Sequence, residues 1–127
     1  MSKQNLQEFI LKAQKILEDK KVKKHQTLYI GAIDQEIEIE SLTEEEIEEW
    51  ISYGDKKKQD AYLCYMGSPT LRELAAELEK LGQIDDYVDV VKIVNAKDRV
   101  EISKKILELS GMFGKTTVRE ADAIKKQ

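Results

Sequence analysis

Residues 37–50 read Ile37-Glu38-Ile39-Glu40-Ser41-Leu42-Thr43-Glu44-Glu45-Glu46-Ile47-Glu48-Glu49-Trp50. Glutamate first alternates with isoleucine, which is the period of a strand with one buried and one charged face. From Thr43 onward the period is that of a helix. Thr43 can cap the first turn, and Glu46 completes a capping box. Leu42 and Ile47 stand at hydrophobic-staple positions. The sequence therefore predicts a strand over 36–40, with Glu40 on its charged outer face, and a helix over 43–53.

The residues before this junction predict a helix and a second strand. The helix covers residues 3–20, with Asn5 as its expected cap and a basic C-terminal end that suits the helix dipole. Its apolar face consists of Leu6, Phe9, Ile10, Ala13, Ile16 and Leu17. Residues 27–33 are rich in strand formers, and Asp34-Gln35 is a turn signal. We expect an antiparallel hairpin over 27–40.

The residues after the junction predict further helices up to residue 110. Ser68-Pro69 is a strong start signal, because it places a cap before a proline at the first helical position. Residues 84–94 keep helical spacing, although their β-branched side chains leave a strand over 87–94 open. Asp98 is the expected cap of the last helix. The expected helix stops are Gly54, Gly67, Gly82 and Gly111.

The expected fold is one α+β domain over residues 1–127, mostly α-helical with one N-terminal hairpin. Thr117 and Glu120 form a second capping box. The tail over 112–127 is nevertheless short of apolar anchors, so we expect it to be mobile or to fold on a partner.

Composition and charge restrict the function. The net charge of −4 argues against nucleic acid as the main partner, and the helix over 71–81 lacks the basic face of a DNA-reading helix. The charge is segregated, with a basic early chain followed by nine acids and no lysine or arginine between His25 and Asp55. Solvated faces explain such segregation, and self-association through the basic and acidic segments is the open alternative. A small DNA-binding or regulatory protein is the rival function.

Catalytic and metal-binding patterns are missing from the sequence. His25 is the only histidine and Cys64 the only cysteine, so neither a Cys/His metal set nor a His-based triad can be assembled. The glycines at 111 and 114 are too close together for a phosphate loop. We expect no catalysis, no cofactor and no metal. The lone cysteine and the lack of a signal peptide or membrane span predict a cytoplasmic protein with no membrane partner.

The remaining function is contact with another protein. Trp50 and Tyr53 share a face of the acidic helix, and Met112 and Phe113 follow a helix stop. We hypothesise that these four residues bind a partner, with packing in the core as the alternative for all four.

Two motifs resemble a known family. They are the run from Ile37 to Glu46, and the helix end Ile106-Leu107-Glu108-Leu109-Ser110-Gly111-Met112-Phe113. Weaker matches lie at 81–86 and 118–121. Together they resemble the tail assembly chaperones of long-tailed bacteriophages, in the type found in prophage-like elements of Gram-positive bacteria. The resemblance implies a non-catalytic protein without a cofactor in the bacterial host cytoplasm. It further implies binding to the helical tape measure protein while tail tube subunits polymerise around it.

Overall fold

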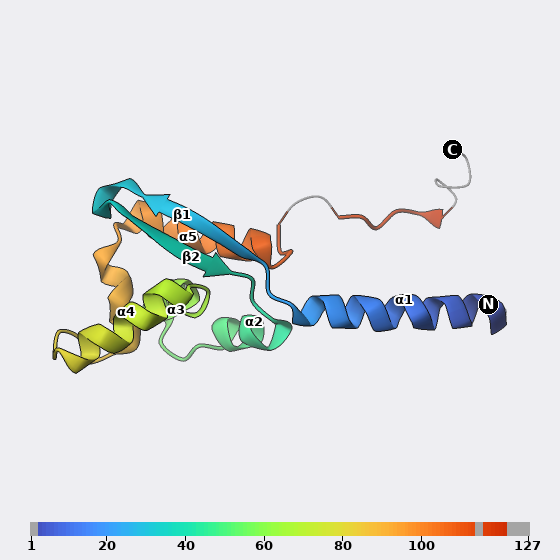
Figure 1. Ribbon diagram of the computed structural model, residues 1–127, viewed down its shortest axis with the longest axis horizontal. Helices are drawn as coiled ribbons and strands as arrows, with labels where there is room; N and C mark the ends of the chain where they lie inside the picture. Colours follow the sequence, from blue (N-terminus) through green and yellow to red (C-terminus); the bar gives the residue numbers. More distant parts are fainter. Residues whose placement is uncertain (1–2, 114–115, 122–127) are drawn as a thin grey trace.

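A computed structural model describes residues 3–113 and 116–121 (Figure 1). The fold is α+β and mostly helical, with one antiparallel hairpin near the N-terminus, as the sequence predicted. The elements are α1 (Lys3–Lys21), β1 (His25–Ile30), the 3-10 helix η1 (Gly31–Ile33), β2 (Gln35–Glu40), α2 (Glu44–Ile51), the 3-10 helix η2 (Lys56–Lys58), α3 (Gln59–Met66), α4 (Pro69–Lys80), the 3-10 helix η3 (Tyr87–Ile93) and α5 (Ala96–Leu109).

The hairpin pairs β1 with β2 in a register that places His25 opposite Glu40 and Leu28 opposite Ile37. Its first strand spans 25–30 rather than the predicted 27–33. Residues 31–33, predicted as the end of this strand, instead form η1, because they belong to the turn between β1 and β2. Asp34 adopts the left-handed conformation with φ 49°, and its N–H donates to the Gly31 carbonyl at 3.2 Å. Asparagine and aspartate tolerate this conformation better than most residues.

The core lies between the hairpin and the helices from α3 to α5. Ile37 and Ile39 of β2 point into it and are almost fully buried, as their alternation predicted. Helix α4 packs on β2 and η3, and α3 packs on α5 and η3. The core cluster consists of Ile30, Ile37, Ile39, Leu42, Leu63, Cys64, Met66, Leu71, Ala75, Val90, Val91, Val94, Ile102, Ile106 and Leu107.

Local signals fix most helix ends. The Thr43 hydroxyl accepts from the Glu46 N–H at 3.2 Å, and the Glu46 carboxylate accepts from the Thr43 N–H at 2.9 Å. The predicted capping box is therefore confirmed. Ser68 caps α4 as predicted, because its hydroxyl accepts from the Leu71 N–H. The predicted stops at 82 and 111 have φ values of 70° and 80°, which glycine adopts most readily.

Other boundaries differ from the prediction. Helix α1 already begins at Lys3, so Asn5 lies inside it rather than at its cap. Helix α2 ends at Ile51, and Ser52 rather than Gly54 is its C-cap residue. Asp98 lies in the first turn of α5, whose N-cap residue is Asn95. Neither an α-helix nor a strand forms over 87–93. The Asp86 carboxylate accepts from the Val88 N–H and starts the 3-10 helix η3.

The C-terminal segment is described only in part. Residues 116–120 have no regular secondary structure, so the capping box predicted at Thr117 does not start a helix there. The Thr116 hydroxyl instead accepts from the Val118 N–H at 3.1 Å. Residues 114–115 and 122–127 of the predicted mobile tail lie outside the described part of the chain.

Candidate protein-binding site

Helix α1 is an arm that projects from the rest of the molecule (Figure 1). It packs extensively on no other element among the described residues. Its large apolar side chains are consequently exposed. They are Leu6, Phe9, Ile10, Leu11, Ile16 and Leu17, and their exposed fractions range from 41% for Ile10 to 67% for Leu11.

Five of these side chains form one stripe. Leu6, Phe9, Ile10, Ile16 and Leu17 recur at spacings of three and four residues, with the smaller Ala13 between them. Such a stripe is roughly 100° wide and normally faces a core. Leu11 lies on the opposite side of the helix. Burial of a large apolar side chain contributes about 1.5–3 kcal/mol, so a stripe left in water is a strong candidate for a binding surface.

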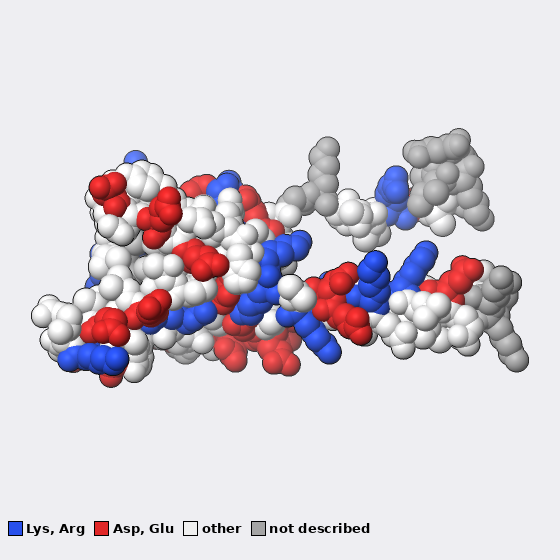
Figure 2. Space-filling model, in the orientation of Figure 1, with Lys and Arg blue, Asp and Glu red and all other residues white. Residues whose placement is uncertain are grey.

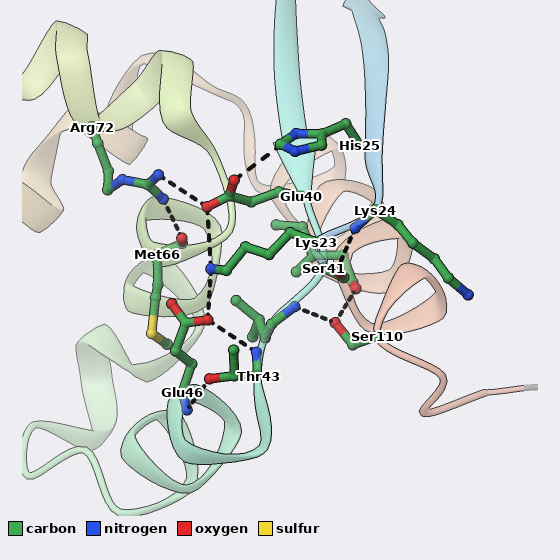
Figure 3. A network of polar contacts seen from close by, with 12 residues as sticks. Lys23, Lys24, His25, Glu40, Ser41, Thr43, Glu46, Met66, Arg72 and Ser110 are labelled. Carbon is green, nitrogen blue, oxygen red and sulfur yellow. Dashed lines mark hydrogen bonds and ion pairs between the residues drawn. The ribbon is translucent and has the colours of Figure 1, made fainter. Parts of the chain in front are cut away.

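The base of α1 is tied to the body by hydrogen bonds that backbone N–H groups donate. The Ser41 N–H donates to the Lys24 carbonyl, and the Lys24 N–H donates to the Ser41 hydroxyl, both at 2.8 Å. The next residue, Leu42, donates its N–H to the Ser110 hydroxyl at 2.8 Å. The connector after α1 is thus joined to the end of β2, which is joined in turn to the end of α5 (Figure 3). These bonds hold the attachment point of the arm.

A buried carboxylate strengthens the same junction (Figure 3). Glu40 is only 7% exposed, which corrects the expectation that it lies on a charged outer face. Arg72 of α4 approaches its carboxylate at 3.0 Å, and the Lys23 ammonium approaches it at 3.3 Å. Arg72 also donates to the Met66 carbonyl. A carboxylate can be buried here because two cations from distant parts of the sequence compensate its charge.

Lys23 bridges this carboxylate to α2. Its ammonium lies 2.7 Å from the Glu46 carboxylate. Burial by itself would raise the pKa of Glu46, but the hydrogen bonds from Lys23 and Thr43, together with the lysine charge, lower the pKa below its ordinary value. Glu46 therefore stays ionised at neutral pH. Figure 2 shows basic side chains gathered where α1 joins the hairpin and acidic side chains gathered over α2 beside them.

Two of the four predicted anchors have partners within the molecule. Trp50 is half-buried and packs against the core cluster. Tyr53 lies beyond the end of α2, and its ring stacks on Tyr62 with centroids 4.2 Å apart and planes within 5°. The expectation that both residues share a face of one helix is wrong, because α2 stops at Ile51.

The other two predicted anchors are open to solvent. Met112 is 47% exposed and Phe113 is 55% exposed, just after α5. The Met112 N–H donates to the Leu107 carbonyl at 2.9 Å, which fixes the start of the segment. Figure 1 shows that this segment leaves the body at the same end as α1. The sequence predicted these two residues as anchors, whereas the stripe on α1 was not predicted as a binding surface. The signal for it was present, since the stripe is the longest apolar pattern before the hairpin.

The described residues contain no group of three or more His, Cys, Asp or Glu side chains that could hold a metal ion. Cys64 is fully buried, and burial raises the pKa of its thiol despite the nearby Ser103 hydroxyl. None of the helices in the described ranges has the length and apolar character needed to cross a bilayer. The chain matches no protein-family model, no curated protein and no solved structure.

Proposed function

We propose that this chain is a non-catalytic tail assembly chaperone that binds a tape-measure-like helical protein during phage tail assembly. The single observation that carries the proposal is the unpartnered apolar stripe of α1. The resemblance of residues 37–46 and 106–113 to such chaperones gives the class of partner. An amphipathic helix commonly binds another helix or an apolar groove through anchors at this spacing.

The charge pattern supports a protein partner. The stripe from Leu6 to Leu17 contains no charged residue, while the lysines and acids of α1 lie at other positions, together with several uncharged residues. A long coiled-coil protein exposes apolar seams before it assembles, and a short helix can cover such a seam by the same knob-in-hole packing. Met112 and Phe113 extend the apolar surface at the end of the body where α1 emerges.

Co-expression with a long helical tape measure protein of the proposed partner class tests the proposal. We expect that protein to be soluble with the chain, insoluble without it, and to co-elute with it. The double variant Phe9→Glu/Ile16→Glu should abolish the effect, since apolar anchors of this size contribute about 2 kcal/mol or more each. The double variant Gln7→Glu/Gln14→Glu is the matched control. It adds the same charge to the same helix at two exposed positions off the stripe.

The outcomes separate the function from the site. If the long protein stays insoluble and no complex elutes, the chaperone assignment is wrong. If the complex forms and both double variants retain it, α1 is not the binding surface. In that case Phe113→Ala, compared with the exposed change Glu48→Ala, tests the second apolar segment.

A further inference from the structure

The outer edge of β2 is closed by side chains and backbone of the α3–α4 turn. The Glu38 N–H donates to the Thr70 hydroxyl at 2.9 Å, and the Glu38 carbonyl accepts from the Ser68 hydroxyl at 2.7 Å. The Glu40 N–H donates to the Gly67 carbonyl at 2.8 Å. The sheet therefore cannot grow on the β2 side.

These bonds fix which backbone groups of β1 point outward. The groups of Glu38 and Glu40 point away from β1, so the pairs Glu38–Thr27 and Glu40–His25 are non-hydrogen-bonded pairs. The backbone groups of Thr27 and His25 must then point away from β2. The bond from the Ser41 N–H to the Lys24 carbonyl agrees with this alternation. It shows that the backbone carbonyl of Lys24, next to His25, points toward the β2 side. By alternation, Tyr29 also presents its N–H and carbonyl at the outer edge of β1.

In the described part of the chain, the outer edge of β1 makes no backbone pairing, although residues of α5 line a pocket beside it. Within the described ranges, no hydrogen bond to another element engages the backbone of these three outward-facing residues. Thr27 is exposed, and Tyr29 is 64% exposed. Proteins usually block a free edge with lysine, proline, a bulge or an inward charge. The strand His25-Gln26-Thr27-Leu28-Tyr29-Ile30 contains no lysine, proline, glycine or acid, whereas the covered strand β2 has three glutamates.

We propose that β1 of a second copy of this chain adds to this edge and joins the two hairpins into one four-stranded antiparallel sheet. A two-fold axis at Leu28 places Thr27 opposite Tyr29 of the second copy. The two equivalent pairs exchange about four backbone hydrogen bonds. Leu28 then meets its own copy on the core face. No lysine, arginine or acid of one β1 strand opposes another across the new interface, so like charges do not oppose the pairing.

This assembly is independent of the proposed function, because it uses the hairpin and leaves the stripe of α1 free. A second copy is the occupant that the strand itself favours. Under the two-fold axis Thr27 and Tyr29 of the two copies face each other in two equivalent pairs, so one strand supplies both sides of the interface. The strand has no lysine, arginine or acid that would select a charged peptide instead.

The substitution Thr27→Pro tests the interface. Proline removes only an outward N–H, and it is accepted on an edge strand where that N–H faces solvent. Thr27→Val is the matched control, since it keeps the N–H and the strand preference. Sedimentation of each protein over about a hundredfold range of concentration should show a reversible dimer for the natural chain, because dimers dissociate by mass action on dilution. We expect Thr27→Pro to weaken the dimer about tenfold or more and Thr27→Val to leave it within about twofold.

Amide hydrogen exchange of the natural chain gives a readout that needs no variant. The N–H groups of Thr27 and Tyr29 should be protected at high concentration and exposed on dilution, while those of Gln26 and Leu28 stay protected by the β1–β2 ladder. A chain that is monomeric throughout, with Thr27 and Tyr29 unprotected, overturns the proposal. So does a dimer that Thr27→Pro leaves intact, which would place the contact on another surface such as α1. If these N–H groups become protected only when a different protein is added, a strand of that protein binds the edge. That result would also overturn the proposal.

Discussion

At the scale of single residues, Thr43 decides where the chain turns from strand to helix. Its hydroxyl and the Glu46 carboxylate satisfy two backbone N–H groups at the start of α2. We expect Thr43→Ala to lower the free energy of unfolding by about 1 kcal/mol. Thr43→Ser should retain most of that stability, because serine is an equally good cap. Denaturant melts measure both, and a Thr43→Ala midpoint equal to that of the natural chain would show that the cap contributes nothing.

Gly67 decides how closely the α3–α4 turn approaches α5. A Cβ added at Gly67 would lie 2.6 Å from Cδ1 and 2.7 Å from Cγ2 of the fully buried Ile106. We expect Gly67→Ala to destabilise the protein by about 1–3 kcal/mol, since overpacking forces the neighbouring side chain out of place.

Gly54→Ala is the control for this substitution, because nothing lies within 4 Å of the added Cβ at Gly54. It should leave the thermal midpoint unchanged or raise it slightly, as the unfolded chain loses freedom. Equal midpoints for Gly67→Ala and Gly54→Ala would contradict the close contact.

At the scale of elements, two ion pairs of one lysine link the hairpin to α2. Lys23 pairs with both Glu40 and Glu46, and the pKa of Glu46 lies below its ordinary value of 4.5. A lowered folded-state pKa gives stability that is present in full above the ordinary value and is lost as the pH falls through the folded value. Stability should therefore be insensitive to this group near neutral pH and fall in acid below about pH 4.5.

Glu46→Gln tests this dependence, because glutamine keeps the capping geometry without the charge. The difference in denaturant midpoint between the natural chain and Glu46→Gln should be largest near neutral pH and should shrink at about pH 3. A difference that grows in acid would mean that the sign of the pKa shift is wrong.

Helix α1 behaves differently from the other elements. Its sequence specifies a helix with one apolar face, but its stripe has no partner in the described chain. Much of the stability of a helix usually comes from packing of its apolar face. Helix α1 is thus the element whose helical stability should increase most when a partner binds, which agrees with the proposed binding role.

At the scale of the whole molecule, charge argues against nucleic acid. The net charge is −4, and several basic side chains are already paired. Arg72 of α4 lies against the Glu40 carboxylate, and the Lys58 ammonium lies 2.7 Å from the Asp86 carboxylate. We expect no specific binding to duplex DNA at physiological salt, because the net charge is negative and these basic side chains are paired with acids. A gel shift that resists salt would contradict this and favour the regulatory rival.

The sequence by itself determined the elements whose signals are local. Thr43 with Glu46, and Ser68 with Pro69, start helices through contacts within one turn, so their types and spacing suffice. The alternation in 37–39 fixed which β2 side chains enter the core. The same alternation misassigned Glu40, because the cations that compensate it stand at Lys23 and Arg72, far away along the chain.

Only the tertiary structure decided what each surface is free to do. Trp50 and Tyr53 are of residue types that often anchor a partner. However, Trp50 packs against the core cluster and Tyr53 stacks on Tyr62. Val88, Val90 and Val91 of the 3-10 helix over 87–93 are buried, which no local period specified. In the described chain, the stripe of α1 is open because no other element packs extensively on it, and the edge of β1 is open because no other backbone pairs with it. Burial depends on which distant segments come together, and no short stretch of sequence contains that information.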